Sequence, residues 1–226
     1  METGNQLMFL VPTIFGGVVM KESKSTILMN WILDQALAGV PPFAPASALA
    51  EDMRRRLPDA SPHAQASKLI LRESVKNFST GFVTGLGGPV TLPLAVPSAI
   101  LSSWLLQARL VAAIALLHGH DLKDPRIRSL VLWALFGDTV KEVLKSTGVP
   151  LTNRLTARFV IALPANVFMA VQRKLGLVFL ERSTRWGMNN LLKIVPVAGG
   201  AVAGTLDAVV LRRVGNTAVE WFEEPS

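Results

Sequence analysis

One charge-free stretch limits the possible folds of this chain more than any other feature. Residues 77–108 contain no charged side chain, yet they include four glycines and three prolines. A charge-free stretch of this length is typical of a segment in contact with lipid. Glycine and proline at this density interrupt a straight spanning helix, and such backbone is tolerated at membrane depth only where protein buries it or where it lines a cavity. The stretch therefore predicts a helical protein that works at or in a bilayer.

The overall composition lies between those of soluble and multispanning proteins. The hydrophobic fraction is 50%, the mean hydropathy is +0.40 and charged residues make up 17%, compared with about 25% in soluble domains. A net charge of +7 predicts an anionic partner. The chain has no cysteine, which excludes disulfides and thiolate ligands. It also lacks the signatures of serine hydrolases, zinc peptidases and nucleotide-binding loops, so we expect no cofactor and no metal.

Apolar periodicity predicts an all-α fold, a compact bundle of amphipathic and apolar helices. Pro164, Gly176 and Gly187 are expected to interrupt the basic segment at 151–192, leaving two or three helices there. Asp124 followed by Pro125 predicts a helix start. The other expected helices cover residues 27–39, 47–57, 64–78, 98–119 and 125–147.

The chain is expected to form one domain over residues 27–218. Residues 1–26 are a leader or an interfacial segment, and residues 219–226 are an acidic tail. No cleavable signal peptide is expected, because Glu2 replaces the usual positive charge and the apolar run at 7–20 has no small-residue cleavage site.

Basic residues are concentrated between positions 141 and 193. Only Glu142 and Glu181 oppose them, so this segment accounts for the whole net charge. Basic residues that alternate with aliphatic runs suit an anionic membrane surface, at about 1 kcal/mol per residue. The aliphatic runs lack stacking aromatics, so nucleic acid is not expected; the alternative is a solvated face of a globular protein. The residues are Lys141, Lys145, Arg154, Arg158, Arg173, Lys174, Arg182, Arg185 and Lys193.

Six phrases follow one another over about residues 28–218. They are WILDQALAG (31–39), SALAEDM (47–53), GFVTGLGGPVTLPLAVP (81–97), LQARLVAAIALLHGHDLKDPRIRSLV (106–131), GDTVKEVLKSTGV (137–149) and LLKIVPVAGGAVAGTLDAVVLRRVGNTA (191–218). The most specific parts are the GLGG-x₃-LP-x₃-P segment, the Q-x-R-x₂-A-x-I-A helix and a C-terminal P-x₂-GG-x₃-G-x-x-D/N-A segment. In this order and spacing, the phrases resemble the EcsC family of bacteria.

This resemblance implies a membrane-associated protein, because EcsC proteins have that character. The founding member is encoded beside an ABC exporter, so the resemblance also implies accessory work for a transporter. It supplies no catalytic residues.

Two ionisable residues interrupt otherwise apolar segments. Arg109 follows Gln107 in an apolar helix, and Asp207 lies alone in a glycine-rich segment. Because an isolated charge in such surroundings is costly, we expect Arg109 and Asp207 to face each other with Gln107 nearby. The pair is either a polar site for a headgroup or peptide, or a structural ion pair that fixes helix register.

Small and rigid residues cluster in the same two segments. Spacings of four residues between glycines give faces that let helices approach closely, within one chain or between copies in a homo-oligomer. The residues that we assign to packing and backbone shape are Gly81, Gly85, Gly87, Gly88, Pro93, Pro97, Gly199, Gly200 and Gly204.

Two other groupings suggest chemistry. His118, His120 and Asp121 form either a metal cluster or, as their place at a helix end indicates, a polar terminus. Asp138 and Asp207 would form an aspartyl protease pair only if they approached closely and one had a raised pKa.

These observations favour a non-catalytic protein on the cytoplasmic side of the cytoplasmic membrane, peripheral or partly inserted. It would bind anionic phospholipid or support an ABC exporter. The alternatives are a soluble helical interaction module and, third, a peptidase or lipid hydrolase.

Overall fold

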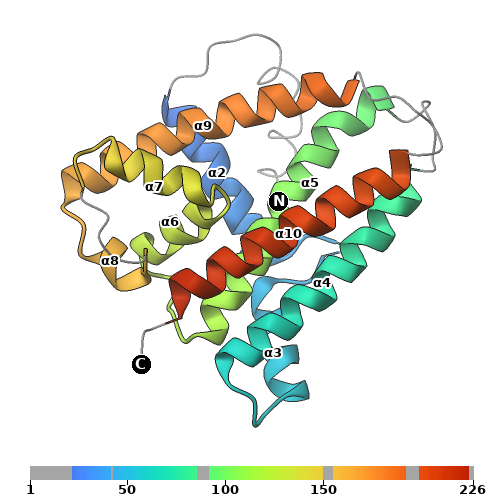
Figure 1. The fold of residues 1–226 in the computed structure, drawn as a ribbon, viewed down its shortest axis with the longest axis horizontal. Coiled ribbons are helices and arrows are strands. Elements are labelled where there is room, and N and C mark those ends of the chain that lie inside the picture. The colour runs from blue at the N-terminus through green and yellow to red at the C-terminus, as the bar shows by residue number, and fades with distance from the viewer. Residues whose placement is uncertain (1–21, 42, 86–91, 150–154, 192–198, 224–226) are drawn as a thin grey trace, which may run out of the picture.

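The computed structural model describes residues 22–41, 43–85, 92–149, 155–191 and 199–223. Side chains are described within 25–41, 43–76, 102–149, 155–182 and 208–223. In these ranges the predicted all-α fold is confirmed, since about 78% of residues are helical and no strand occurs. Figure 1 shows the helices, which are α2 (Glu22–Ala38), α3 (Ala46–Arg56), α4 (Pro62–Gly85), α5 (Leu92–Leu117), α6 (Pro125–Ala134), α7 (Asp138–Lys145), α8 (Ala157–Ile161), α9 (Ala165–Leu191) and α10 (Gly199–Phe222).

Helix α5 lies at the centre and packs against α2, α3, α4, α6, α9 and α10. No side chain between residues 108 and 115 is more than 8% exposed. A helix that is apolar on all sides is buried on all sides. Four of these eight residues are alanines, and small side chains at a contact let neighbouring helices approach closely.

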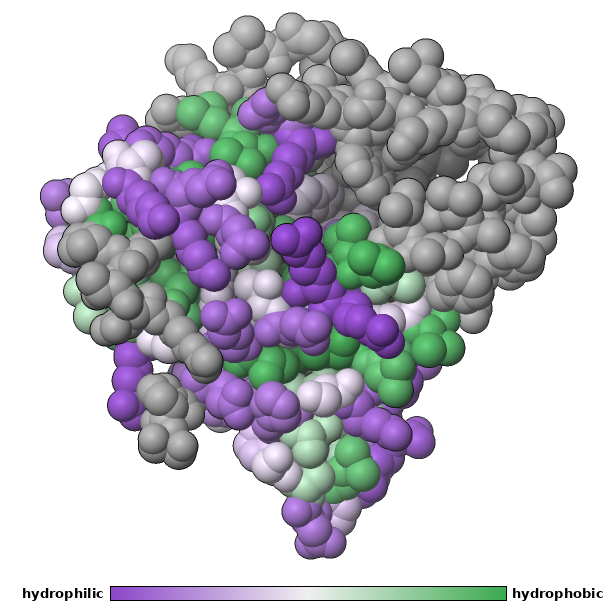
Figure 2. Space-filling view, in the orientation of Figure 1, coloured by the Kyte–Doolittle hydropathy of each residue, from purple (hydrophilic) through white to green (hydrophobic). Residues whose placement is uncertain are grey.

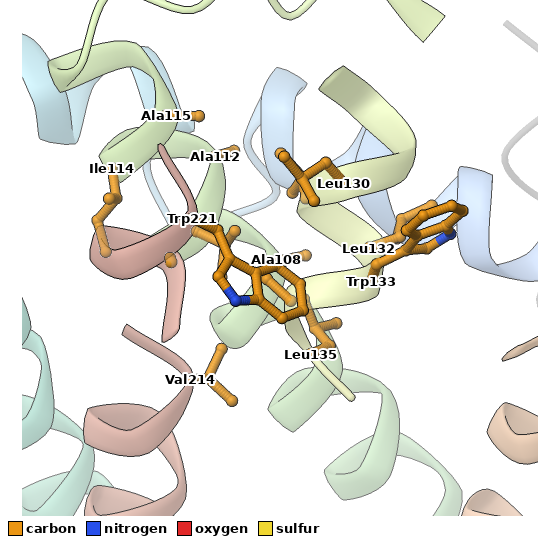
Figure 3. Close-up of a cluster of buried hydrophobic side chains, with 14 of the residues drawn as sticks. Ala108, Ala112, Ile114, Ala115, Leu130, Leu132, Trp133, Leu135, Val214 and Trp221 are labelled. Atoms are coloured by element: carbon orange, nitrogen blue, oxygen red, sulfur yellow. The ribbon is translucent and has the colours of Figure 1, made fainter. Parts of the chain in front are cut away.

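Large side chains from α6 and α10 fill the space around this alanine-rich surface. Figure 3 shows Trp221 of α10 beside Ala108, with Leu135 next to it. Trp133 of α6 is also fully buried, and its indole N–H donates to the Gln172 side chain of α9 (3.0 Å). One apolar core therefore connects α5, α6, α9 and α10.

Helices α4 and α10 run antiparallel, side by side (Figure 1). The two helices come close to each other at Gly215, where an added Cβ would lie 2.6 Å from Cγ1 of Ile70. Glycine at this point therefore sets the distance between the helices. The pairing places the start of α4 next to the end of α10.

Four helix ends meet at one end of the molecule. Helix α4 ends there, α5 begins, α9 ends and α10 begins (Figure 1, upper right). Residues 77–85, 92–101 and 199–207 carry much of the charge-poor sequence to this place, which we call the charge-poor end. Among the described residues, no helix has both the length and the apolar character needed to cross a bilayer.

The helix predicted over 125–147 is wrong, because it is two helices. Helix α6 ends at Ala134, and Gly137, which directly precedes α7, has a positive φ of 56° that a continuous helix does not contain. The start at Asp124 is confirmed, since its Oδ1 accepts from the Arg126 amide (2.7 Å). Helix α5 starts at Leu92, earlier than predicted, and includes Pro93 and Pro97.

The breaks predicted at Gly176 and Gly187 are also wrong, whereas the break at Pro164 is confirmed. Helix α9 is continuous from Ala165 to Leu191. Gly176 serves packing instead: a Cβ there would lie 2.6 Å from Oγ of Ser25 in α2. A glycine inside a helix is tolerated when a neighbouring helix needs its space.

Both expected domain limits fall inside helices. Helix α2 begins at Glu22 and buries Ser25, so part of the expected leader belongs to the fold. Helix α10 continues to Phe222 and buries Val219, Trp221 and Phe222, so the segment expected to be an acidic tail begins with core residues.

Candidate functional site

A buried ion pair occupies the polar site expected around Arg109. The Arg109 guanidinium donates to a carboxylate oxygen of Glu73 in α4 (2.8 Å), and the two side chains are 9% and 7% exposed. It also donates to the carbonyl of Ala44 (3.3 Å) and lies over the Phe43 ring at 5.3 Å. Burial lowers the pKa of Arg109, while Glu73 opposes this shift and Arg72 adds to it.

Glu73 joins this pair to a chain of surface charges. Its other carboxylate oxygen contacts Arg72 (3.2 Å) and Lys76 (3.4 Å). Arg72 in turn bonds to Asp52 of α3. Hydrogen bonds from Arg56 and Arg72, the largest causes, lower the pKa of Asp52 to about 2. The network connects α3, α4 and α5 and places Arg109 at its buried end.

The predicted pairing of Arg109 with Asp207 stays a prediction, because the Asp207 side chain lies outside the described residues. Nε of Arg109 is buried and has no hydrogen-bond partner among the described atoms. Gln107 donates to Oγ of Ser103 (3.1 Å), one turn earlier in α5.

The sequence contained a signal for Glu73 that periodicity reasoning missed. Ala66, Leu69 and Ile70 are the buried face of α4, and Glu73 follows at the same helical spacing. An acid on a buried stripe needs a basic partner, and Arg109 is the buried arginine of α5. Pairing these two would have given the observed contact.

The basic segment folds into α7, α8 and α9, and α7 packs against α9. Lys174 donates to Oγ of Ser146 (2.7 Å), and Arg182 donates to Oγ1 of Thr139 (2.7 Å). Lys141 contacts Asp138 (3.2 Å). Burial lowers the pKa of Arg182, and Glu142 and Glu181 oppose this shift. Lys145 is exposed, and the side chains of Arg154, Arg185 and Lys193 lie outside the described residues.

Exposed apolar side chains lie among these basic residues on α8 and α9. Ile161 is 43% exposed, Met169 is 55% and Leu177 is 47%. Met169, Arg173 and Leu177 are spaced four residues apart, so they share one stripe of α9. We call the exposed residues Arg158, Ile161, Met169, Arg173, Lys174 and Leu177 the α8–α9 face.

Arg126 fixes the corner between α8 and α9. Its Nη1 donates to the carbonyls of Val160 (3.1 Å), Ile161 (2.9 Å) and Leu163 (2.6 Å). These include carbonyls that the end of a short helix leaves without partners. Its guanidinium also lies 5.0 Å from the centre of the Phe168 ring. The α8–α9 face is therefore anchored at its corner by a half-buried arginine.

The glycines and prolines assigned to packing divide between described and undescribed parts. Gly81 and Gly85 lie in α4, Pro93 and Pro97 in α5, and Gly199, Gly200 and Gly204 in α10, all near the charge-poor end (Figure 1). Gly87 and Gly88 lie outside the described residues. The contacts that these positions make are not described, so their packing role stays a prediction.

Neither the metal cluster considered for His118, His120 and Asp121 nor the aspartyl protease pair considered for Asp138 and Asp207 gains support. In the part of the chain that is described, no group of three or more metal-ligating side chains is placed to hold an ion. Asp138 is 70% exposed and contacts Lys141 and Arg213 (3.5 Å). An aspartyl protease pair instead needs two carboxylates that approach each other.

Comparison with protein families, with curated proteins and with solved structures found no match to this chain. The resemblance to the EcsC family therefore stays a prediction.

Proposed function

We propose that the protein is a non-catalytic, membrane-associated helical protein that binds anionic phospholipid through its α8–α9 face. The observation that carries the proposal is the exposure of Ile161, Met169 and Leu177 next to Arg158, Arg173 and Lys174. Apolar side chains that enter the headgroup boundary, flanked by basic ones, are typical of helices that lie on membranes.

The arrangement of the helices supports the same proposal. Helix α9 runs from the α8 corner to the charge-poor end along one edge of the molecule (Figure 1). If α9 lay along the bilayer surface, both the α8–α9 face and the charge-poor end would contact the lipid. Accessory work for an ABC exporter on the cytoplasmic side, as the EcsC resemblance implies, is compatible with such a position.

Co-sedimentation with vesicles tests the proposal. The protein should bind vesicles that contain phosphatidylglycerol and should not bind vesicles of phosphatidylcholine alone. Reversing two charges of the face (Arg173→Glu with Lys174→Glu) should weaken binding by at least about 2 kcal/mol, roughly thirtyfold, because each basic residue near the headgroups contributes about 1 kcal/mol.

The matched control reverses two exposed lysines elsewhere, Lys68 of α4 and Lys123 after α5. It changes the net charge equally and should weaken binding much less. Equal loss in both double variants would show that net charge alone drives binding. Absence of binding to anionic vesicles would favour the soluble interaction module.

A further inference from the structure

Exposed apolar side chains lie on α4 and α10 directly before the charge-poor end. Val75 of α4 and Val209 of α10 are each 58% exposed, and Leu71 and Val210 are 44% and 38% exposed. Figure 2 shows hydrophobic side chains over these two helices, next to the part of the molecule drawn in grey. We call the four residues the apolar rim.

The pairing of α4 with α10 brings the four residues into one patch. The two helices run antiparallel (Figure 1), and Ile70 lies against Gly215. Val75 lies as far beyond this contact along α4 as Val210 lies along α10, so both valines reach the same level of the pair. Leu71 lies one turn before Val75 on the same side of α4. A contiguous exposed apolar patch marks a surface that contacts a protein or a membrane.

Exposed basic residues border the apolar rim. They are Lys76 of α4 and Arg212 and Arg213 of α10. Lys76 also contacts the buried Glu73 (3.4 Å), and Arg213 contacts Asp138 of α7 (3.5 Å), yet these two basic side chains are 64% and 81% exposed. Long basic side chains can lie with their stems on apolar surface while their charges stay in water, as they do at a headgroup boundary.

The exposed acids of the same helix pair lie at its opposite end. Glu220 and Glu223, near the end of α10, line a hollow of about 450 Å³ between α10 and the start of α4. Among the described side chains of the two helices, the acid nearest to the apolar rim is Glu73, which is buried and paired with Arg109. This distribution of charge fits an anionic bilayer on the side of the rim, because its surface attracts the basic residues and repels the exposed acids.

The helix segments beyond the basic residues have about the length of one leaflet. Residues 77–85 continue α4 past Lys76, and residues 199–211 precede Arg212 in α10. At about 1.5 Å per residue these segments extend about 14 Å and about 20 Å, and one leaflet contributes about half of the roughly 30 Å hydrocarbon core. Asp207 is the one charged residue of both segments, and it lies closer to Arg212 than to the start of α10.

We infer that the charge-poor end enters one leaflet of an anionic bilayer as far as the apolar rim, so that Lys76, Arg212 and Arg213 contact the lipid phosphates. Val75 and Val209 then lie in the headgroup boundary, where membrane-surface helices bury their apolar side chains. The inference rests on the proposed function, because it needs the same anionic bilayer. It adds which end of the molecule enters the lipid, and how far.

Fluorescent labels at single cysteines test the depth of insertion, because the full chain has no cysteine of its own. Val75→Cys and Val209→Cys report the apolar rim, and Met169→Cys reports the α8–α9 face. Ser67→Cys is the matched control, since it is exposed on the same helix two turns before Val75. Each labelled variant is mixed with phosphatidylglycerol vesicles, with a quencher either on the lipid acyl chains or in the water. Labels at 75, 209 and 169 should shift their emission to the blue and be quenched from the lipid, whereas the label at 67 should stay accessible from the water.

The outcomes separate this inference from the proposed function. A response at Met169→Cys without one at Val75→Cys and Val209→Cys would overturn the inference and leave binding through the α8–α9 face standing. Equal responses at Ser67→Cys and Val75→Cys would also overturn it, since α4 would then lie flat on the bilayer. No response at any position would show that the protein does not bind this bilayer, and both the inference and the proposed function would fall.

A binding measurement that needs no label gives a second test. Val75→Asn combined with Val209→Asn should weaken binding to phosphatidylglycerol vesicles by at least about tenfold, because more than half of each side chain is available to the lipid. Circular dichroism should show unchanged helix content, since both positions are exposed. Unchanged affinity of the folded double variant would overturn the inference.

Discussion

Arg109 and Glu73 form an ion pair between α5 and α4 with less than a tenth of either side chain exposed. Removing two charges from water costs several kcal/mol per ion, and mutual attraction offsets this only with good geometry and additional hydrogen bonds. Both conditions hold here, because Arg109 also bonds to the Ala44 carbonyl and Glu73 also contacts Arg72. The pair fixes the register of two helices next to the charge-free stretch.

Glu73→Gln should lower the free energy of unfolding by about 3–5 kcal/mol, because it leaves the Arg109 charge buried without its counter-ion. Urea denaturation followed by circular dichroism measures the change. Glu73→Leu combined with Arg109→Met should be more stable than Glu73→Leu alone, since the double variant removes both charges.

Arg55→Ala is the matched control, because Arg55 is exposed and pairs with Asp52 at the surface. It should cost less than about 1 kcal/mol. Similar losses for Glu73→Gln and Arg55→Ala would contradict the importance of burial.

Asp207→Ala tests the predicted second partner of Arg109. The loss of stability that it causes should disappear in an Arg109→Met background if the two side chains interact.

The sequence indicated that Arg109 needs a buried partner but not which acid supplies it. Asp207 stands alone in an apolar segment, whereas Glu73 has Arg72 and Lys76 close by in sequence, so composition favours Asp207 as the partner. Helical spacing places Glu73 on the buried side of α4. Which face of α4 meets α5 depends on tertiary packing, and one sequence does not specify that.

Met169→Asn and Leu177→Asn should each weaken binding to anionic vesicles by roughly tenfold, if these side chains enter the bilayer. Burying a large apolar side chain is worth about 1.5–3 kcal/mol, and half of each is already covered by protein. Stability in urea should change little, because both positions are exposed. Binding should weaken with rising salt concentration as steeply as in the wild type, since no charge is removed. A different salt dependence would contradict a separate contribution from the apolar side chains.

Gly215→Ala should destabilise the fold by about 1–3 kcal/mol through overpacking, because its Cβ would lie 2.6 Å from Ile70 Cγ1. Ile70→Ala should also destabilise, by leaving a cavity. The double variant should be more stable than the sum of both losses predicts, because the new methyl group partly fills the space. Strictly additive losses would show that the two residues do not share a contact.

Glycine illustrates how much of the fold the sequence predicts. Gly39, Gly119 and Gly148 follow helices with φ near 80°, at or next to the helix limits that the sequence predicts at 39, 119 and 147. Gly137 also has a positive φ, but the apolar stripe continues past it, so periodicity predicts one helix where the structure has α6 and α7. Gly176 is predicted to break a helix, but it contacts α2 instead. The local sequence indicates that a glycine has a structural role. Whether it forms a turn or lets two helices approach closely depends on the neighbouring helix.

Asp52→Asn should reduce stability at neutral pH, and this loss should fade in acid. Hydrogen bonds from Arg56, Arg72 and Arg55 hold the pKa of Asp52 near 2, compared with an ordinary value of 3.8. Because the folded-state pKa is depressed, the carboxylate stabilises the fold above about pH 4 and loses this effect as the pH falls towards 2. Urea denaturation at intervals between pH 5 and pH 2 should therefore show wild type and Asp52→Asn converging. The control is Asp59→Asn at an exposed position, which should leave the pH dependence of stability as it is in the wild type. A difference in the free energy of unfolding between wild type and Asp52→Asn that stays constant down to pH 2 would contradict the role assigned to the Asp52 carboxylate.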